Sequence, residues 1–306
     1  MKKYRVYIVL MIVMLFWGFN VSATKVLVTH FAPLTMTAFR ILTAGITVLL
    51  ILRAMKVSKK LELKELGFIM FVGLFNVVAH HFFLSLGLQK TTATNAGLIM
   101  GLAPLMTTVL AILFLGTRLT GVRLIGILLG LIGVGFVVLN GGGALSSGSL
   151  GDLFIFVSLF VQAISYVFIR KASATIDGRV MTGWMLVTGG AYLFIISLFM
   201  EPKGFSTMMT GDIGLWAIFL ASAILATAVG HMVYNQAVQH IGAAESAIFV
   251  NLSPFFALVG SSLFLGETIR LQQMLGFIFI ILGVLCGSGV VEKVIRSRKK
   301  SIHMSA

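Results

Sequence analysis

The chain has 306 residues, of which 58% are hydrophobic and 10% are charged, and its mean hydropathy is +1.06. This composition excludes a water-soluble globular protein and predicts an all-α integral membrane protein surrounded by the lipid bilayer. The net charge of +14 does not indicate a nucleic-acid partner, because nearly all lysines and arginines fall in short segments between apolar runs.

Ten apolar runs are long enough to cross a hydrocarbon core of about 30 Å as helices. The first follows Lys2, Lys3 and Arg5, as a signal peptide would, but nine more runs follow, so we expect a retained helix. The runs cover approximately residues 6–27, 34–54, 66–88, 93–115, 122–139, 151–170, 180–200, 213–237, 244–265 and 272–291.

The positive charges predict the orientation of these ten spans. If the N-terminus is cytoplasmic, the outer loops carry only Lys25, Lys90, Lys203 and Arg270 of the 23 lysines and arginines. Arg40 lies within a span, and all the others face the cytoplasm. Cytoplasmic loops of membrane proteins are enriched in lysine and arginine, so we expect both termini on the cytoplasmic side of the plasma membrane.

The second half of the chain repeats the first at an offset of 150 residues. Residues 87–139 and 237–289 align without a gap with twelve identities, which include Pro104 with Pro254 and Gly116 with Gly266. Each half holds five spans, and because five is odd, the second half must enter the membrane from the opposite side. We therefore expect two inverted repeats, 6–139 and 151–291, with an extracytoplasmic linker at 140–150 and a basic cytoplasmic tail at 292–306. The alternative is a duplication that only built a stable bundle.

Several segments resemble the drug/metabolite transporter superfamily, in its EamA family. They are "FWGFNVSATK" (16–25), "PLTMTAFRILTAG" (33–45), the proline-containing fourth and ninth runs, and "FLGETI" (264–269) followed by "GFIFIILGV" (276–284). The resemblance implies ten helices in two EamA repeats, a central cavity, and transport of small metabolites, often outward, by alternating access. One departure is Thr117, which stands where the family usually has the glutamate seen here at Glu267.

Polar side chains within the apolar runs predict a substrate cavity, because a polar group that faces lipid lacks hydrogen-bond partners. Amide, imidazole and aromatic groups together suit a small zwitterionic or heterocyclic solute. The alternative is hydrogen bonding between helices that only holds the bundle together. The predicted cavity residues are Trp17, Asn20, Arg40, Asn76, His80, Asn95, Gln162, Tyr166, His231, Tyr234, Asn235 and Asn251.

Arg40 is the one formal charge well inside a span. Its planar guanidinium could hold a substrate carboxylate or phosphate. The alternative is a side chain that extends to the membrane surface, which its depth of about 9 Å permits.

The acidic residues all fall in loops or at span ends, so the sequence offers no obvious buried carboxylate for a proton relay. Histidines titrate near neutral pH, and His80, His81 and His231 are therefore candidates for proton coupling. Glu245, in the first turn of the ninth run, is a further candidate, although helix capping is the alternative. Facilitated diffusion or exchange remains open.

Pro104 and Pro254 occupy equivalent interior positions of the fourth and ninth runs. Proline removes a backbone donor and displaces a carbonyl, so we predict a matched pair of hinges, with static curvature as the alternative. Glycine pairs at positions 126 and 130 and at 283 and 287 permit close helix approach, either inside a monomer or between the copies of a homodimer.

Other functional classes are less consistent with this sequence. The single cysteine, Cys286, excludes an intramolecular disulfide, and we expect no catalytic residue, metal or cofactor. The adjacent His80 and His81 diverge by about 100° on a helix and are poor joint metal ligands. A channel is disfavoured because rings of charge are absent. A flippase for lipids or lipid-linked substrates, and a membrane sensor that binds its ligand without moving it, remain alternatives to a carrier.

Overall fold

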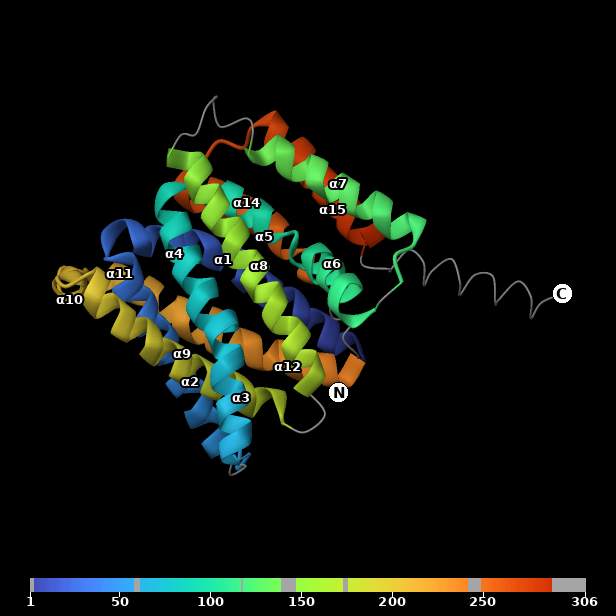
Figure 1. The fold of residues 1–306 in the computed structure, drawn as a ribbon. Coiled ribbons are helices and arrows are strands. Elements are labelled where there is room, and N and C mark those ends of the chain that lie inside the picture. Colours follow the sequence, from blue (N-terminus) through green and yellow to red (C-terminus); the bar gives the residue numbers. More distant parts are fainter. Residues whose placement is uncertain are drawn as a thin grey trace.

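The computed structural model describes residues 3–57, 61–116, 118–138, 147–172, 176–241 and 249–287, and the regular structure in these ranges is entirely helical (Figure 1). The first half contains α1 (Lys3–His30), α2 (Pro33–Ala54), α3 (Leu63–Gly73), the π-helix η1 (Leu74–Ala79), α4 (His80–Lys90), α5 (Ala93–Met100), α6 (Ala103–Leu115) and α7 (Gly121–Val138). The second half contains α8 (Ser147–Ala172), α9 (Gly178–Met200), α10 (Gly204–Met208), α11 (Ile213–Leu220), the π-helix η2 (Ala221–Val229), α12 (Gly230–Ile241), α14 (Ser253–Leu265) and α15 (Leu271–Gly287).

Within the described ranges, six helical segments are long and apolar enough to cross a membrane. Four shorter apolar helices cover residues 121–137, 150–166, 253–265 and 271–287. The all-helical, multi-pass architecture expected from the composition is thus confirmed. Several helices extend beyond the predicted runs: the third run continues through η1 from Leu63 to Lys90, and the sixth starts at Ser147.

The fourth run is interrupted, where a single kinked helix was expected. The helix α5 ends at Met100, and α6 begins at Ala103 with Pro104 in its second position. Pro254 has the same place in α14. Proline suits the first turn of a helix, because the backbone donor it lacks would have no partner there. Each proline therefore starts a half-helix rather than bending a continuous one.

Further irregularities recur in both halves. The π-helices η1 and η2 interrupt the third and eighth predicted spans at corresponding depths. Gly116 and Gly266 end α6 and α14 in the left-handed conformation, with φ of 64° and 63°. A left-handed residue closes a helix at low cost only when it is glycine. The sequence repeat is thus matched by repeated backbone conformations.

The helices α7 and α15 lie side by side (Figure 1) and touch through their glycines. A Cβ atom added to Gly283 would come 2.7 Å from the backbone nitrogen of Gly130, and one added to Gly276 would come 2.8 Å from the carbonyl oxygen of Gly133. These contacts join the two halves of one chain. The glycine pairs are therefore used within the monomer, which was one of the two predicted alternatives.

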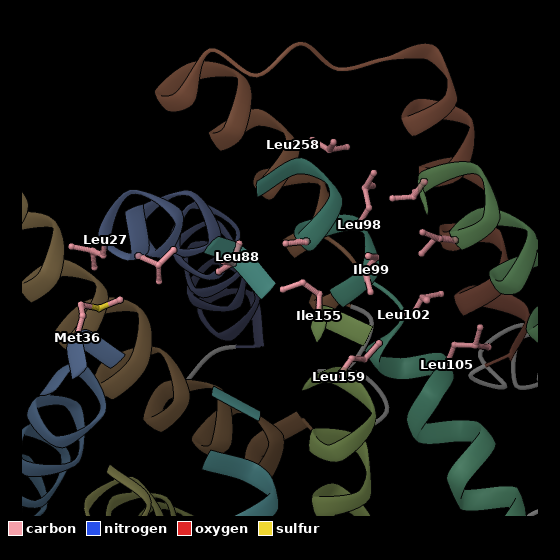
Figure 2. Close-up of a cluster of buried hydrophobic side chains, with 14 of the residues drawn as sticks. Leu27, Met36, Leu88, Leu98, Ile99, Leu102, Leu105, Ile155, Leu159 and Leu258 are labelled. Atoms are coloured by element: carbon pink, nitrogen blue, oxygen red, sulfur yellow. The ribbon is translucent and has the colours of Figure 1, made fainter. Parts of the chain in front are cut away.

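A buried apolar cluster joins both halves beside this helix pair (Figure 2). Leu98, Ile99 and Leu102 at the break of the fourth span meet Ile155 and Leu159 of α8. Tight packing on both sides of the break fixes where the two half-helices start and stop, and so positions the polar residues beside them.

Candidate functional site

A cavity of about 150 Å³ lies between the two halves at the helix breaks. An apolar cavity of about this volume is large enough to bind a single aromatic ring. Its wall comes from α1, α2, α4, α5, α6, α8, η2, α12, α14 and the turn between α5 and α6. The predicted residues on this wall are Trp17, Asn20, Arg40, His80, His81, Gln162, Tyr166, His231 and Pro254.

Arg40 is buried in α2, with only 1% of its surface exposed. Its Nη1 donates hydrogen bonds to Ser222 Oγ at 3.3 Å and to Thr227 Oγ1 at 3.2 Å, both from η2. Its Nε has no hydrogen-bond partner. Among the described residues no carboxylate lies within ion-pair distance of it, and none lines the cavity. The burial excludes the alternative of a side chain that extends to the membrane surface.

Three histidines surround the same part of the cavity. His80 Nδ1 lies 2.8 Å from Ser158 Oγ, whose hydroxyl donates to the His80 carbonyl at 2.8 Å. The rings of His80 and His81 are 4.6 Å apart, and His81 Nδ1 is buried without a hydrogen-bond partner. Both rings and His231 are close enough to Arg40 to interact electrostatically. The wall therefore places the positive charge of Arg40 beside the hydrogen-bonding groups of three imidazoles.

Aromatic rings form a second part of the site, around Trp17. The ring of Trp17 lies 4.8 Å from that of His231 and 5.2 Å from that of Tyr234. Trp17 Nε1 donates to the carbonyl of Ala226 at 3.0 Å, which is a carbonyl of the π-helix η2. This bond fixes the indole against the irregular backbone, and Trp17 and Tyr166 both face the cavity.

Five predicted cavity residues lie elsewhere or cannot be placed. Asn76 donates to Ser165 Oγ at 2.7 Å and so joins two helices, which was the alternative for such residues. Tyr234 stands behind Trp17, off the cavity wall. Asn251 lies in the turn before α14, its Oδ1 buried without a partner. The Asn235 side chain and Glu245 are outside the described residues.

The fifth, Asn95, belongs to a network at the predicted outer end, meaning the end where α1, α4 and α9 finish and α2, α5 and α8 begin. Its amide donates to both carboxylate oxygens of Asp152, at 3.3 and 3.1 Å, and its Oδ1 accepts from Gln273 at 2.8 Å. Thr91 Oγ1 also donates to Asp152, which is only 3% exposed. The sequence offered no obvious buried carboxylate, but Asp152, which lies at a span end as expected, is buried.

Two further carboxylates at this end cap helices of the first half. Glu267, after α14, accepts from the amides of Ala93 and Thr94, each at 2.9 Å, and from the Thr94 hydroxyl. Glu201, after α9, accepts in the same way from Leu34 and Thr35 at the start of α2. Negative charge at a helix N-terminus is favourable. Carboxylates of the second half thus cap two helices of the first half at the predicted outer end.

Polar residues missed by the sequence complete the site. Ser222 donates to Asn20 Oδ1 and accepts from Arg40, and it is 2% exposed. A lone serine in an apolar run gives no signal by itself. Only the pairing of η2 with α1 and α2 shows that it links two predicted cavity residues.

The chain is similar to known transporters over nearly its whole length. The model of the EamA-like transporter family matches residues 5–139 and 149–288. The uncharacterized transporter YyaM of Bacillus subtilis is 30% identical, over 95% of this chain and 96% of that protein. An uncharacterized transporter of Archaeoglobus fulgidus is 25% identical over 93% of this chain and 98% of the relative. A solved structure, described as "Crystal structure of protein", is 16% identical with a TM-score of 0.68, covers 96% of this chain and 99% of that chain, and so has the same fold.

Proposed function

The chain belongs to the EamA-like transporter family, and from its cavity we propose that this membrane transporter carries small metabolites that bear a carboxylate, either amino-acid-like or heterocyclic. Transport in this proposal is outward and proceeds by alternating access. The protein lies in the plasma membrane, with ten helices in two inverted repeats and with both termini cytoplasmic.

The observation that carries this proposal is the unpaired Arg40 on a wall without carboxylates in its described residues. A buried charge without a countercharge is costly, and a bound anion would remove that cost. Two long hydrogen bonds to hydroxyl groups and an unsatisfied Nε leave donors free for a carboxylate. The three nearby imidazoles add donors and no negative charge.

The remaining wall suits the rest of such a solute. Trp17, Tyr166 and His231 present aromatic faces, which attract both a ring and an ammonium group. Gln162 and Asn20 supply amides. A cavity of about 150 Å³ accepts a solute of one ring or a short side chain. A zwitterion would place its two charges on Arg40 and on the aromatic faces.

The repeated breaks support alternating access. Broken helices beside a central site, in two repeats of opposite topology, let one half rock against the other. Here both breaks border the cavity, through Gly101 and Ala103 in one half and Ser253 and Pro254 in the other. In this proposal the carboxylate caps hold the outer end closed, and the solute enters from the cytoplasm.

Exchange in proteoliposomes tests the proposal. The panel comprises amino acids, nucleosides and cationic drugs, with three matched imidazoles: histidine, imidazolepropionate, which lacks the ammonium, and histamine, which lacks the carboxylate. We expect exchange of carboxylate-bearing solutes and none of their decarboxylated partners. No exchange of any solute, with or without a pH gradient, would overturn the carrier. Exchange of amines alone would overturn the role of Arg40.

Two alternatives within the same fold have distinct results in this assay. A flippase would move a fluorescent phospholipid between leaflets and would not respond to water-soluble competitors. A sensor would bind a panel member, with thermal stabilisation, and move none.

A further inference from the structure

The cavity leaves one buried ionisable group unused, the carboxylate of Asp152 near the start of α8. It is 3% exposed and, within the described residues, forms no ion pair. Carboxylates in such surroundings are expensive in membrane proteins and usually have a function. Its carboxylate accepts hydrogen bonds from two residues, Thr91 and Asn95, which in turn bond to other helices, and this makes it the centre of the network at the predicted outer end.

This network ties together helices that are distant in sequence. Gln273 of α15 donates to Asn95 of α5, which donates to both oxygens of Asp152. Thr91, between α4 and α5, donates to the same carboxylate. The carbonyl of Thr91 in turn accepts from Lys25 Nζ of α1 at 2.7 Å. One carboxylate therefore lies at the centre of a hydrogen-bond network that joins α1, α4, α5, α8 and α15.

The hydrogen bonds from Asn95 and Thr91 depend on a charged acceptor, the Asp152 carboxylate. A deprotonated carboxylate only accepts hydrogen bonds, and each bond to it is about twice as strong as a bond between neutral groups. Protonation removes the charge and turns one oxygen into a donor, which can no longer accept well from Asn95 or Thr91. The hydrogen bonds that join these helices through Asp152 would therefore weaken.

Among the residues that the structure describes, no charged group forms an ion pair with Asp152. Lys25 donates hydrogen bonds to the carbonyls of Leu88 and Thr91, and the carboxylate that interacts electrostatically with Lys25 is Glu267. Lys90, at the end of α4, has an exposed side chain. His30, at the end of α1, is exposed and bonded to the Val26 carbonyl.

We propose that Asp152 is a proton-binding site, and that its protonation from the outer side releases Thr91 and Asn95 and opens the outer end. This inference rests on the proposed carrier function, because an outer gate matters only to a protein that alternates access. The inference places proton binding at the outer end, whereas the sequence indicated the cavity histidines as candidates for proton coupling.

Thiol accessibility of Leu84→Cys in a Cys286→Ser background tests this without a substrate. Leu84 lines the cavity on α4, about 9 Å inside the helix end at Lys90. Labelling uses a membrane-impermeant maleimide on right-side-out vesicles, with the external pH lowered from about 8 to about 5 to protonate a carboxylate. The variant Asp152→Asn keeps the shape and removes the charge. Asp212→Asn, an exposed cap at the same end, is the matched control.

We expect labelling to accelerate by about tenfold as the pH falls, because charge-assisted bonds become neutral ones. Asp152→Asn should label fast at every pH, and Asp212→Asn should follow the wild type. An Asp152→Asn variant with the wild-type pH dependence would overturn the inference and indicate another outer group, such as His30. In the infrared spectrum, a protonated-carboxyl band that appears with acid in wild type and is missing in Asp152→Asn would support it; a band unchanged by the substitution would refute it. Failure of solute exchange with intact pH-dependent labelling would instead count against the carrier.

Discussion

Replacing Arg40 with methionine should separate solute binding from folding. Methionine is unbranched, flexible and uncharged, so it can occupy the space of the aliphatic part of the arginine in α2. If Arg40 is present to hold a carboxylate, Arg40→Met should lose the solute and keep the fold. If Arg40 is a structural residue, the same change should unfold the protein.

The magnitudes follow from its contacts. Two charge-assisted hydrogen bonds to a carboxylate contribute about 3–6 kcal/mol, so their loss should weaken binding about 100-fold or more. Ser222 and Thr227 lose a donor but keep other partners: Ser222 still donates to Asn20, and Thr227 to the Ser222 carbonyl. Replacing buried charge with an apolar side chain is often neutral or stabilising by about 1–4 kcal/mol. The unfolding temperature of Arg40→Met should therefore stay the same or rise.

Two measurements on purified protein decide the outcome. Thermal unfolding in detergent reports stability, and exchange in proteoliposomes, with the solute that the wild type exchanges fastest, reports binding. Arg40→Lys is the control, because it keeps the charge and loses the planar guanidinium. Its exchange rate should fall between those of the wild type and Arg40→Met. Wild-type exchange by Arg40→Met, or an unfolding temperature lowered by several degrees with about 1 kcal/mol or more lost, would refute the reasoning.

Three further changes test the fold around the cavity. Gly283→Ala should cost about 1–3 kcal/mol in thermal unfolding, because its Cβ would meet backbone of α7, whereas Gly121→Ala enters open space and should cost little; equal costs would contradict the close packing. Glu267→Gln weakens the cap of α5 and should cost about 1–2 kcal/mol, measured in the same way; an unchanged midpoint would show that the cap contributes nothing. Pro254→Ala should slow exchange without lowering the yield of folded protein, while Pro33→Ala, at the start of α2, should exchange like the wild type; normal exchange by Pro254→Ala would argue that the break at this proline is static.

The repeated backbone features could be predicted from the sequence because they are local. Pro104 cannot continue a helix from the preceding turn, and Gly116 permits a left-handed end, wherever they occur. Their copies at 254 and 266 therefore gave the same breaks. The exact outcome is an interruption at Gly101 in place of a kink, where Gly101 packs against Pro254 of the second half, a contact that no local rule contains.

The cavity could be predicted in part for a similar reason. Polar side chains in spans must turn inward, which correctly directed Trp17, Arg40 and His231 to one wall. The rule does not say which inward group they meet. Asn95 was therefore predicted to be a cavity residue. Its partners, 57 residues away at Asp152 and 178 away at Gln273, hold it instead in the network at the predicted outer end.

The two π-helices would allow parts of the third and eighth spans to rotate about the helix axis. A π-helical turn holds more residues than the α-helical turn that would replace it, and each residue of an α-helix accounts for about 100° of rotation. A shift of hydrogen bonds by one residue within η1 or η2 would therefore turn the following segment about its own axis. His80 follows η1 directly, and His231 follows η2 by one residue. Such a shift could point these imidazoles toward or away from a bound solute while every helix axis stays in place.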